Sequence, residues 1–213
     1  MTMVEKSSTQ EVFSIQDFVA ELDKLPALLF RDVERVYKFI CAHPVDPNTL
    51  APYLMWDKQH YTRNLISKTS DYELMAICWE AGQSSSIHNH DEQNCWMAVP
   101  IGRLLVQNYR VLSQEIEKGL SALEITDTLE INPVGPVAVD PDCPVHRVHN
   151  PVEFNRRAVS LHLYSLPFET CIVYSHERGT CGVTNLRYTT EYGRSGSNSC
   201  LAERSPQRSP DQI

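Results

Sequence analysis

Residues 82–102 read GQSSSIHNHDEQNCWMAVPIG and place His88 and His90 two positions apart. Because side chains alternate across a β-strand, both imidazoles would project from one face of a strand and could converge on one metal ion. A His-x-His pair on a strand is also typical of two half-buried, hydrogen-bonded side chains. The pair therefore predicts a metal site only if a third ligand comes from elsewhere in the chain.

A second stretch offers that ligand. Residues 135–150 read GPVAVDPDCPVHRVHN and contain His146. Together the two stretches resemble the paired signature of the cupins, small β-barrels that hold a metal between a first motif with His-x-His and a second with one further histidine. Cys95 stands where most cupins have a glutamate ligand, and Cys143 stands where glycine is usual. The resemblance implies a mainly β fold, a cupin-type antiparallel β-barrel or jelly roll.

The composition argues against several classes of partner. The chain has 213 residues, with 19 Lys plus Arg against 27 Asp plus Glu, which gives a net charge of −8. An acidic chain lacks the cationic stripe that binds nucleic acid or an anionic membrane surface. The polar N-terminal residues lack the apolar core of a signal peptide, and no later apolar run is long enough to span a bilayer. Seven cysteines without an export signal favour a reduced, cytoplasmic setting.

The expected organisation is a single cupin domain between two flexible ends. We expect a flexible N-terminus at 1–11, one domain over 12–192 and a disordered tail, rich in Ser, Arg, Pro and Gly, at 193–213. Within the domain, helices are expected in 12–55 and the barrel in 58–192.

The helices are predicted from apolar periodicity over residues 12–41, with a break at Pro26. Asp46 and Pro47 read as an N-cap followed by a proline in the first turn, which opens a third helix towards Tyr53. We expect these helices to pack on the outside of the barrel.

From residue 61 the apolar pattern changes to a period of two. Many short segments separated by turn-forming clusters are typical of an antiparallel barrel or sandwich. The expected strands are 61–67, 72–79, 86–90, 95–99, 104–109, 125–131, 136–139, 145–148, 157–164, 171–174 and 186–190. Pro100 removes a ladder donor, so the strand that begins at Cys95 is expected to end there.

Two further groups of polar residues lie at a spacing of two. Tyr61 and Arg63 share a strand face, and an interior arginine would offer its planar fork to a carboxylate. An isolated arginine is more often part of a surface ion pair. Ser160, His162 and Tyr164 also share a face. A polar row is usually solvent-facing, but facing inward it would form a hydrogen-bonded relay that holds the Tyr164 phenol at the metal.

The combination of these stretches is similar to cysteine dioxygenase, a thiol dioxygenase family of the cupin superfamily. The resemblance runs in order from about residue 61 to residue 171. It rests on YTRNL from 61, SSIHNH from 85 with Cys95, HRV from 146 and SLHLYSLPF from 160. Asn89 and Asn94 depart from the aspartate and histidine of animal relatives. Neither position is a ligand, so the departures concern tuning of the site rather than the reaction.

The resemblance implies an enzyme that oxidises L-cysteine with O2 to cysteine sulfinic acid at a non-haem Fe(II) centre. The implied metal ligands are His88, His90 and His146. The substrate would chelate Fe(II) through its thiolate and amine, while Arg63, helped by Tyr61, receives the carboxylate.

The resemblance also implies roles for the polar row. Tyr164 would lie beside the bound oxygen, with Ser160 and His162 behind it. A thioether bond between Cys95 and Tyr164 is implied as well, and both residues are present. Such a bond would restrict the motion of the phenol.

Two alternatives stay open at this point. The first is a dioxygenase for another small thiol such as 3-mercaptopropionate; relatives with that preference carry glutamine in place of the arginine, so Arg63 favours L-cysteine. The second is a non-catalytic metal-binding cupin, which the retained Tyr164, Cys95 and Arg63 disfavour. We expect a monomer whose partners are L-cysteine and O2, with no nucleic acid and no membrane.

Overall fold

Two β-sheets and a layer of helices make up the fold. The structure, a computed structural model, describes residues 12–133, 135–139 and 144–195. The N-terminus expected to be flexible, residues 1–11, lies outside the described residues, as do Cys143 and residues 196–213 of the expected tail.

Four helical segments precede the first strand in the described chain. They are α1 Ile15–Leu22, the 3₁₀ helix η1 Ala27–Arg31, α2 Val33–Ala42 and the 3₁₀ helix η2 Pro47–Tyr53. Side chains of Ser14, Asp32 and Asp46 accept hydrogen bonds from first-turn N–H groups and so cap α1, α2 and η2. The predicted cap at Asp46 is confirmed, although the helix that it opens is a 3₁₀ helix. None of the described helices is long and apolar enough to cross a membrane.

The rest of the described chain is mainly β-strand. The strands are β1 Thr62–Lys68, β2 Tyr72–Trp79, β3 Ile87–His88, β4 Cys95–Ile101, β5 Leu104–Glu115, β6 Leu120–Ile131, β7 Val137–Ala138, β8 Val145–His149, β9 Ala158–Ser165, β10 Thr170–Ser175, β11 Thr180–Asn185, β12 Thr190–Glu191 and β13 Arg194–Ser195. Short 3₁₀ helices, η3 Ile116–Lys118 and η4 Val152–Phe154, lie in the connections.

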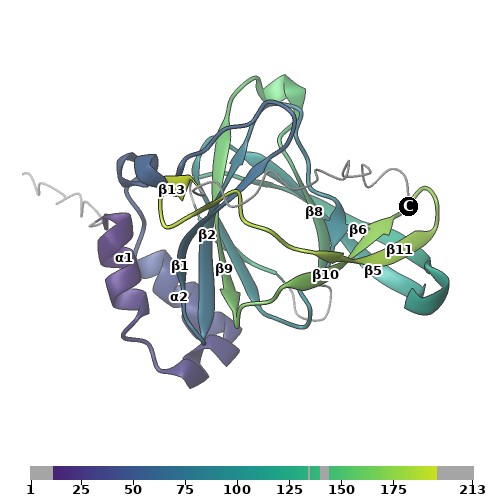
Figure 1. Cartoon of the computed structure of the whole chain (residues 1–213), viewed down its shortest axis with the longest axis horizontal. Coiled ribbons are helices and arrows are strands. Elements are labelled where there is room, and N and C mark those ends of the chain that lie inside the picture. The colour runs from purple at the N-terminus through teal and green to yellow at the C-terminus, as the bar shows by residue number, and fades with distance from the viewer. Residues whose placement is uncertain (1–11, 134, 140–143, 196–213) are drawn as a thin grey trace, which may run out of the picture.

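The strands form two sheets. The first has the order β13-β12-β1-β2-β9-β4-β7, and the second closes on itself in the order β10-β11-β6-β5-β8-β3. Pairing is antiparallel throughout except between β1 and β12. The β5-β6 hairpin extends away from the helices, at the opposite end of the molecule (Figure 1).

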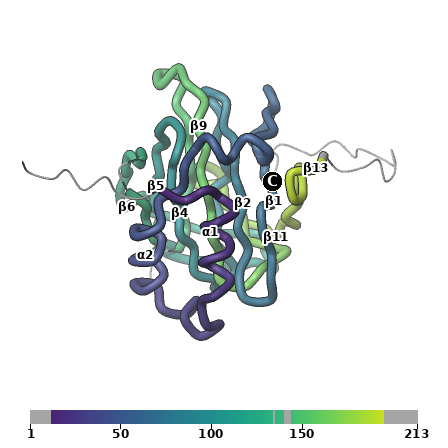
Figure 2. Tube along the Cα trace, turned by 90° about the vertical axis from the view of Figure 1, so that its left-hand side faces the viewer, coloured from purple at the N-terminus to yellow at the C-terminus, as the bar shows by residue number. Residues whose placement is uncertain are grey.

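The first sheet is buried on both faces because it is the middle layer. Every residue of β2 and β9 is buried. On the outer face, Leu74, Trp96 and Leu161 pack with Phe18 and Leu22 of α1, and α1 and α2 cover this face (Figure 2). The inner face contributes to a second core, shared with the other sheet. The prediction of a cupin-type antiparallel β-barrel with helices packed outside is confirmed.

Several strand bounds differ from the prediction. β5 and β6 form a hairpin longer at its tip than expected, and β11 was not predicted. The tip side chains are mostly exposed on both faces, so no alternation of apolar and polar residues marks them. The strand expected at 186–190 is wrong, because only Thr190 of that segment belongs to a strand.

Two predicted ends were also wrong. β4 continues through Pro100 to Ile101, and a shift in its register with β9 after Ala98 accommodates the proline. β13 lies within the segment 193–213 that was expected to be a disordered tail, and it pairs with β12.

The turn between β4 and β5 requires glycine. Gly102 has φ +75°, and a Cβ there would lie 2.6 Å from the carbonyl oxygen of Arg157. We expect Gly102→Ala to lower the free energy of unfolding by about 3 kcal/mol, because it combines left-handed strain with a backbone clash. Gly182→Ala is the control, since no atom lies within 4 Å of its added Cβ. Urea unfolding that shows equal stability for both variants would contradict the prediction.

Candidate metal centre and substrate pocket

Two sequence motifs meet at the metal centre. Ser85 N–H donates to the carbonyl of Val148 at 2.8 Å, and Val148 N–H donates to the Ser85 hydroxyl at 2.9 Å. A few residues further along, His88 in β3 is the direct cross-strand partner of His146 in β8. Cross-strand partners have side chains on the same face of a sheet. The pairing of β3 with β8 therefore brings the third predicted ligand to the His-x-His pair.

The three predicted ligands form one cluster. One nitrogen from each of His88, His90 and His146 lies within 4.8 Å of the others. The ring centroids are 4.7 to 5.2 Å apart. The Nδ1 atom of His88 lies 2.9 Å from the carbonyl oxygen of Ser86, so Nδ1–H donates and Nε2 is left as the ligand atom.

The cluster is suited to a metal cation. His90 and His146 are buried, and both carry ring nitrogens without a hydrogen-bond partner among the described residues. Burial lowers the pKa of His88 to about 4 and holds the pKa values of His90 and His146 well below the usual range. All three rings are therefore neutral near pH 7, as ligation requires. Buried polar atoms normally have partners, and a metal ion would supply the missing ones.

The polar row of β9 faces the interior. The Ser160 Oγ atom lies 2.9 Å from His162 Nε2, and the Tyr164 hydroxyl lies 3.1 Å from His162 Nδ1. The indole N–H of Trp79 donates to Ser160 Oγ at 2.9 Å, which the sequence did not indicate. All four side chains are buried. The inward-facing alternative for this row is therefore the one observed.

Tyr164 connects this row to the histidine cluster. Its ring centroid lies 5.7 Å from that of His90, and Phe168 packs edge-on against it at 5.0 Å. Burial raises the pKa of the Tyr164 phenol well above its usual value, so the group is protonated at neutral pH. Cys95 in β4 is a buried free cysteine and the direct cross-strand partner of Tyr164. The two residues of the implied thioether bond are thus neighbours.

Arg63 lies on the inner face of β1, paired with Ile77. Its side chain is 14 % exposed, so it is not the surface arginine that an isolated occurrence would suggest. Its positive charge contributes to the lowered pKa values of His88, His90 and His162, which places the guanidinium towards the cluster. The Nε and Nη2 atoms are buried and have no hydrogen-bond partner within the described chain.

Tyr61 stands next to this guanidinium. Its ring stacks on Trp79 with centroids 4.6 Å apart, and Trp79 in turn bonds the polar row. Burial raises the pKa of the Tyr61 phenol, and the charge of Arg63 opposes the shift. The predicted pair Tyr61 and Arg63 therefore lies together in the interior, with the charge of Arg63 acting on the histidine cluster.

One charged group beside Arg63 was missed. Glu73, in β2, is fully buried and 3.9 Å from Arg63 Nη2. Lys68 and Tyr188 contact the same carboxylate. The sequence could have indicated Glu73, because it is the single charged residue in the otherwise apolar stretch from Tyr72 to Trp79.

Comparison with known proteins agrees with this arrangement. The family model "Cysteine dioxygenase type I" matches residues 3–177. Over 196 residues the chain is 26 % identical to cysteine dioxygenase type 1 of Danio rerio, 28 % to that of Homo sapiens and 29 % to that of Rattus norvegicus. Each alignment covers 89 % of this chain and 93 % of the relative. Because the matched family model spans both cupin motifs and the polar row, the chain belongs to the cysteine dioxygenase type I family.

Proposed function

We propose that this protein is an iron-dependent thiol dioxygenase that oxidises L-cysteine with O2 to cysteine sulfinic acid. The observation that carries the proposal is a buried cluster of three neutral imidazoles with the charged fork of Arg63 directed towards it. Both groups have buried nitrogens that lack partners in the described residues. A metal cation matches the imidazoles, and a carboxylate matches the guanidinium. A small thiol that bears a carboxylate can meet both.

The metal in the proposal is Fe(II), held by His88, His90 and His146. When bound, Fe(II) would supply a Lewis acid for the substrate thiolate and amine and the redox chemistry for oxidation by O2, with both oxygen atoms transferred to the substrate sulfur. Three neutral ligands leave the charge of a dication uncompensated, which favours an anionic thiolate.

Arg63 would bind the substrate carboxylate. Its unpartnered Nε and Nη2 atoms lie on one edge of the planar guanidinium, so they can donate two parallel hydrogen bonds to one carboxylate. Tyr61 stands beside this guanidinium and would support the same carboxylate. The substrate would then be held at both ends, with its thiol at the metal. Positioning of this kind turns a collision between reactants into a reaction within one complex.

The polar row would present the phenol hydrogen of Tyr164 to the reacting sulfur and oxygen. An indole N–H can only donate a hydrogen bond, so Trp79 fixes the donor-to-acceptor direction of every hydrogen bond in this row. Trp79 donates to Ser160, Ser160 to His162 Nε2 and His162 Nδ1–H to the Tyr164 oxygen. The Tyr164 hydrogen is then free to point into the pocket. The low pKa of His162, about 3 because of burial, keeps this imidazole neutral as the chain requires.

The test is anaerobic loading of the purified protein with Fe(II), followed by addition of L-cysteine and oxygen. We expect O2 uptake and cysteine sulfinate in equal amounts. No uptake by an iron-loaded protein would favour the second candidate, a metal-binding cupin without catalysis. Faster turnover of 3-mercaptopropionate than of L-cysteine would instead assign the enzyme to another small thiol. Metal analysis of protein purified without added metal would identify the ion bound on purification.

We also propose the Cys95–Tyr164 thioether bond. Its formation joins the sulfur to the phenol ring, and O2 accepts the two hydrogen atoms that are lost, as hydrogen peroxide. Intact-mass measurement after aerobic incubation with Fe(II) and L-cysteine is expected to reveal chains lighter by two hydrogen atoms. Cys95→Ser should lack this species, whereas Cys171→Ser, at another buried cysteine, should retain it. The same mass loss in Cys95→Ser would contradict the proposed bond.

The remaining parts of the proposal concern the setting of the enzyme. We infer a cytoplasmic monomer that acts on small molecules. The odd number of cysteines, seven, and the acidic composition support a reducing compartment without nucleic-acid partners. Light scattering of the purified protein tests the monomer.

A further inference from the structure

Glu73 is a buried carboxylate with no part in the mechanism above. It lies in the middle of the first sheet, where its direct cross-strand neighbours are Lys68 in β1 and Tyr164 in β9. Its side chain is 0 % exposed. A glutamate is almost never fully buried unless it is paired, because an uncompensated buried charge is costly. Its partners therefore indicate what it does.

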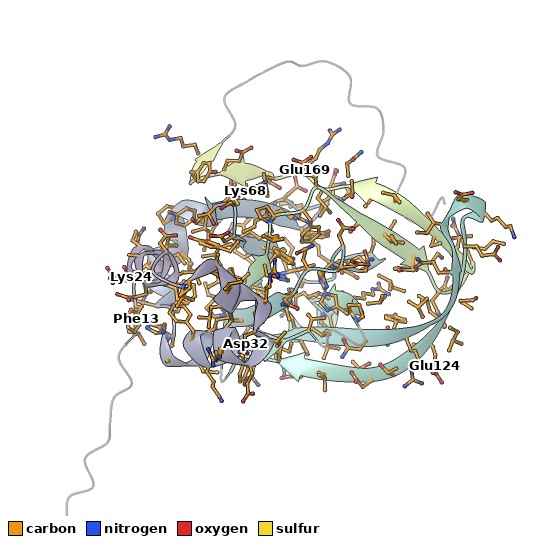
Figure 3. The ribbon with its side chains drawn as sticks, turned by 90° about the horizontal axis from the view of Figure 1, so that it is seen from below. Phe13, Lys24, Asp32, Lys68, Glu124 and Glu169 are labelled. Carbon is orange, nitrogen blue, oxygen red and sulfur yellow. The ribbon has the colours of Figure 1, made fainter. Side chains whose placement is uncertain are left out.

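One oxygen of Glu73 is fully engaged. Oε2 accepts a hydrogen bond from the Tyr188 hydroxyl and lies 3.6 Å from Lys68 Nζ. The Lys68 ammonium also donates to the Tyr188 hydroxyl at 3.1 Å. Figure 3 shows Lys68 among the strands, apart from the helical layer that carries Lys24 and Asp32. These contacts hold the carboxylate in one orientation.

The other oxygen faces Arg63. Oε1 lies 3.9 Å from Arg63 Nη2 and has no hydrogen-bond partner in the described part of the chain. Thr189, next to Tyr188 in sequence, holds the main chain of Arg63. The Arg63 N–H donates to Thr189 Oγ1 at 3.1 Å, and the Thr189 N–H donates to the Arg63 carbonyl at 2.7 Å. The segment around Tyr188 thus fixes both the arginine backbone and the carboxylate beside its guanidinium.

An ion pair that served stability alone would be closed by hydrogen bonds. Here Arg63 Nε and Nη2 and Glu73 Oε1 are all left open. We propose that Glu73 is a positioning residue that holds the guanidinium of Arg63 towards the pocket and so sets the preference for thiols that carry a carboxylate. This inference rests on the proposed function and names a determinant of its substrate class.

The charges of the group support this role. Arg63 and Lys68 contribute two positive charges and Glu73 one negative charge, so one positive charge is left for one substrate carboxylate. Without the charge of Glu73, the two cations would repel each other and the guanidinium would lose its lateral restraint. A mobile guanidinium must be ordered again on each binding event, which weakens binding of the carboxylate only.

The experiment compares two ligands that differ in one group. Dissociation constants of L-cysteine and of 2-aminoethanethiol, which lacks the carboxylate, are measured by calorimetry on the Fe(II)-loaded enzyme without oxygen. The dissociation constant of 2-aminoethanethiol divided by that of L-cysteine reports the carboxylate contact. We expect Glu73→Gln to reduce this ratio by about tenfold through weaker L-cysteine binding, with 2-aminoethanethiol unchanged. Tyr188→Phe, which loosens the carboxylate but keeps its charge, should give a smaller reduction, and it decides the question if Glu73→Gln does not fold.

Glu80→Gln is the matched control, because Glu80 forms a partly exposed ion pair with Arg157 and contacts neither Arg63 nor Lys68 in the described chain. It should leave the ratio at the wild-type value. An unchanged ratio in folded Glu73→Gln, or tighter L-cysteine binding, would overturn the positioning role while leaving the proposed function intact. A wild-type protein that does not discriminate between the two ligands would instead overturn the proposed function.

Discussion

Replacing His146 by alanine is expected to remove both iron retention and oxygen consumption with L-cysteine. The variant leaves His88 and His90 as the ligands, and two imidazoles hold a divalent cation far less tightly than three. We expect iron affinity to fall by about 100-fold or more, since even changes behind the ligands cost 10- to 100-fold. Iron content after dialysis and initial O2 uptake provide the measurements.

His149→Ala is the matched control for this variant. His149 lies on the same strand, β8, but three positions away and therefore on the opposite face. It does not belong to the histidine cluster. Iron content and O2 uptake should stay at the wild-type level. Loss of iron in both variants would point to damage of β8 rather than loss of a ligand.

Stability separates the ligand role from packing. In the metal-free protein, the ring nitrogens of His146 are buried and lack partners in the described chain, which costs about 1 to 3 kcal/mol per unpaired group. In the metal-free state, removal of these unpaired nitrogens by His146→Ala therefore offsets part of the unfolding free energy that is lost through the new cavity. The wild-type protein should gain stability on addition of metal, and the variant should not. Thermal unfolding with and without Fe(II) measures the difference, and equal gains would contradict a ligand role for His146.

The alternation of side chains explains which parts of the site could be predicted. His88 with His90, and Ser160 with His162 and Tyr164, lie at a spacing of two, so each group shares a face in any extended strand. What the spacing could not supply is the pairing between β3 and β8, because a register between distant segments depends on the whole sheet. The resemblance to a known family filled that gap.

The strand segments that were missed share a physical cause. β11 and the tip of the β5-β6 hairpin have exposed faces, so their sequence lacks the apolar alternation that marks a half-buried strand. Glu73 was missed for another reason. Its partners Lys68 and Tyr188 are 5 and 115 positions away in sequence, and only the fold brings Tyr188 to it.

The second large effect is expected at Arg63, where Arg63→Gln should lower kcat/KM for L-cysteine by about 100-fold. The loss corresponds to a bidentate, charge-assisted contact with a carboxylate in a mostly buried pocket. Arg63→Lys keeps the charge but not the fork, so it should recover only part of the activity. Arg103→Gln, at an exposed ion pair with Glu130, is the matched control and should leave kcat/KM unchanged.

The two thiols distinguish the competing substrates in the same set of variants. L-cysteine and 3-mercaptopropionate both carry a thiol and a carboxylate, but only L-cysteine carries an amine. If Arg63 selects L-cysteine, the wild-type enzyme should prefer it, and Arg63→Gln should shift the ratio of kcat/KM values towards 3-mercaptopropionate. A wild-type enzyme that turns over both equally well would reject L-cysteine as the preferred substrate. Loss of activity with both thiols in Arg63→Gln, at an unchanged ratio, would leave Arg63 as an anchor for the carboxylate that both thiols carry and would reject its role in selecting L-cysteine, because a residue that selects must alter the ratio.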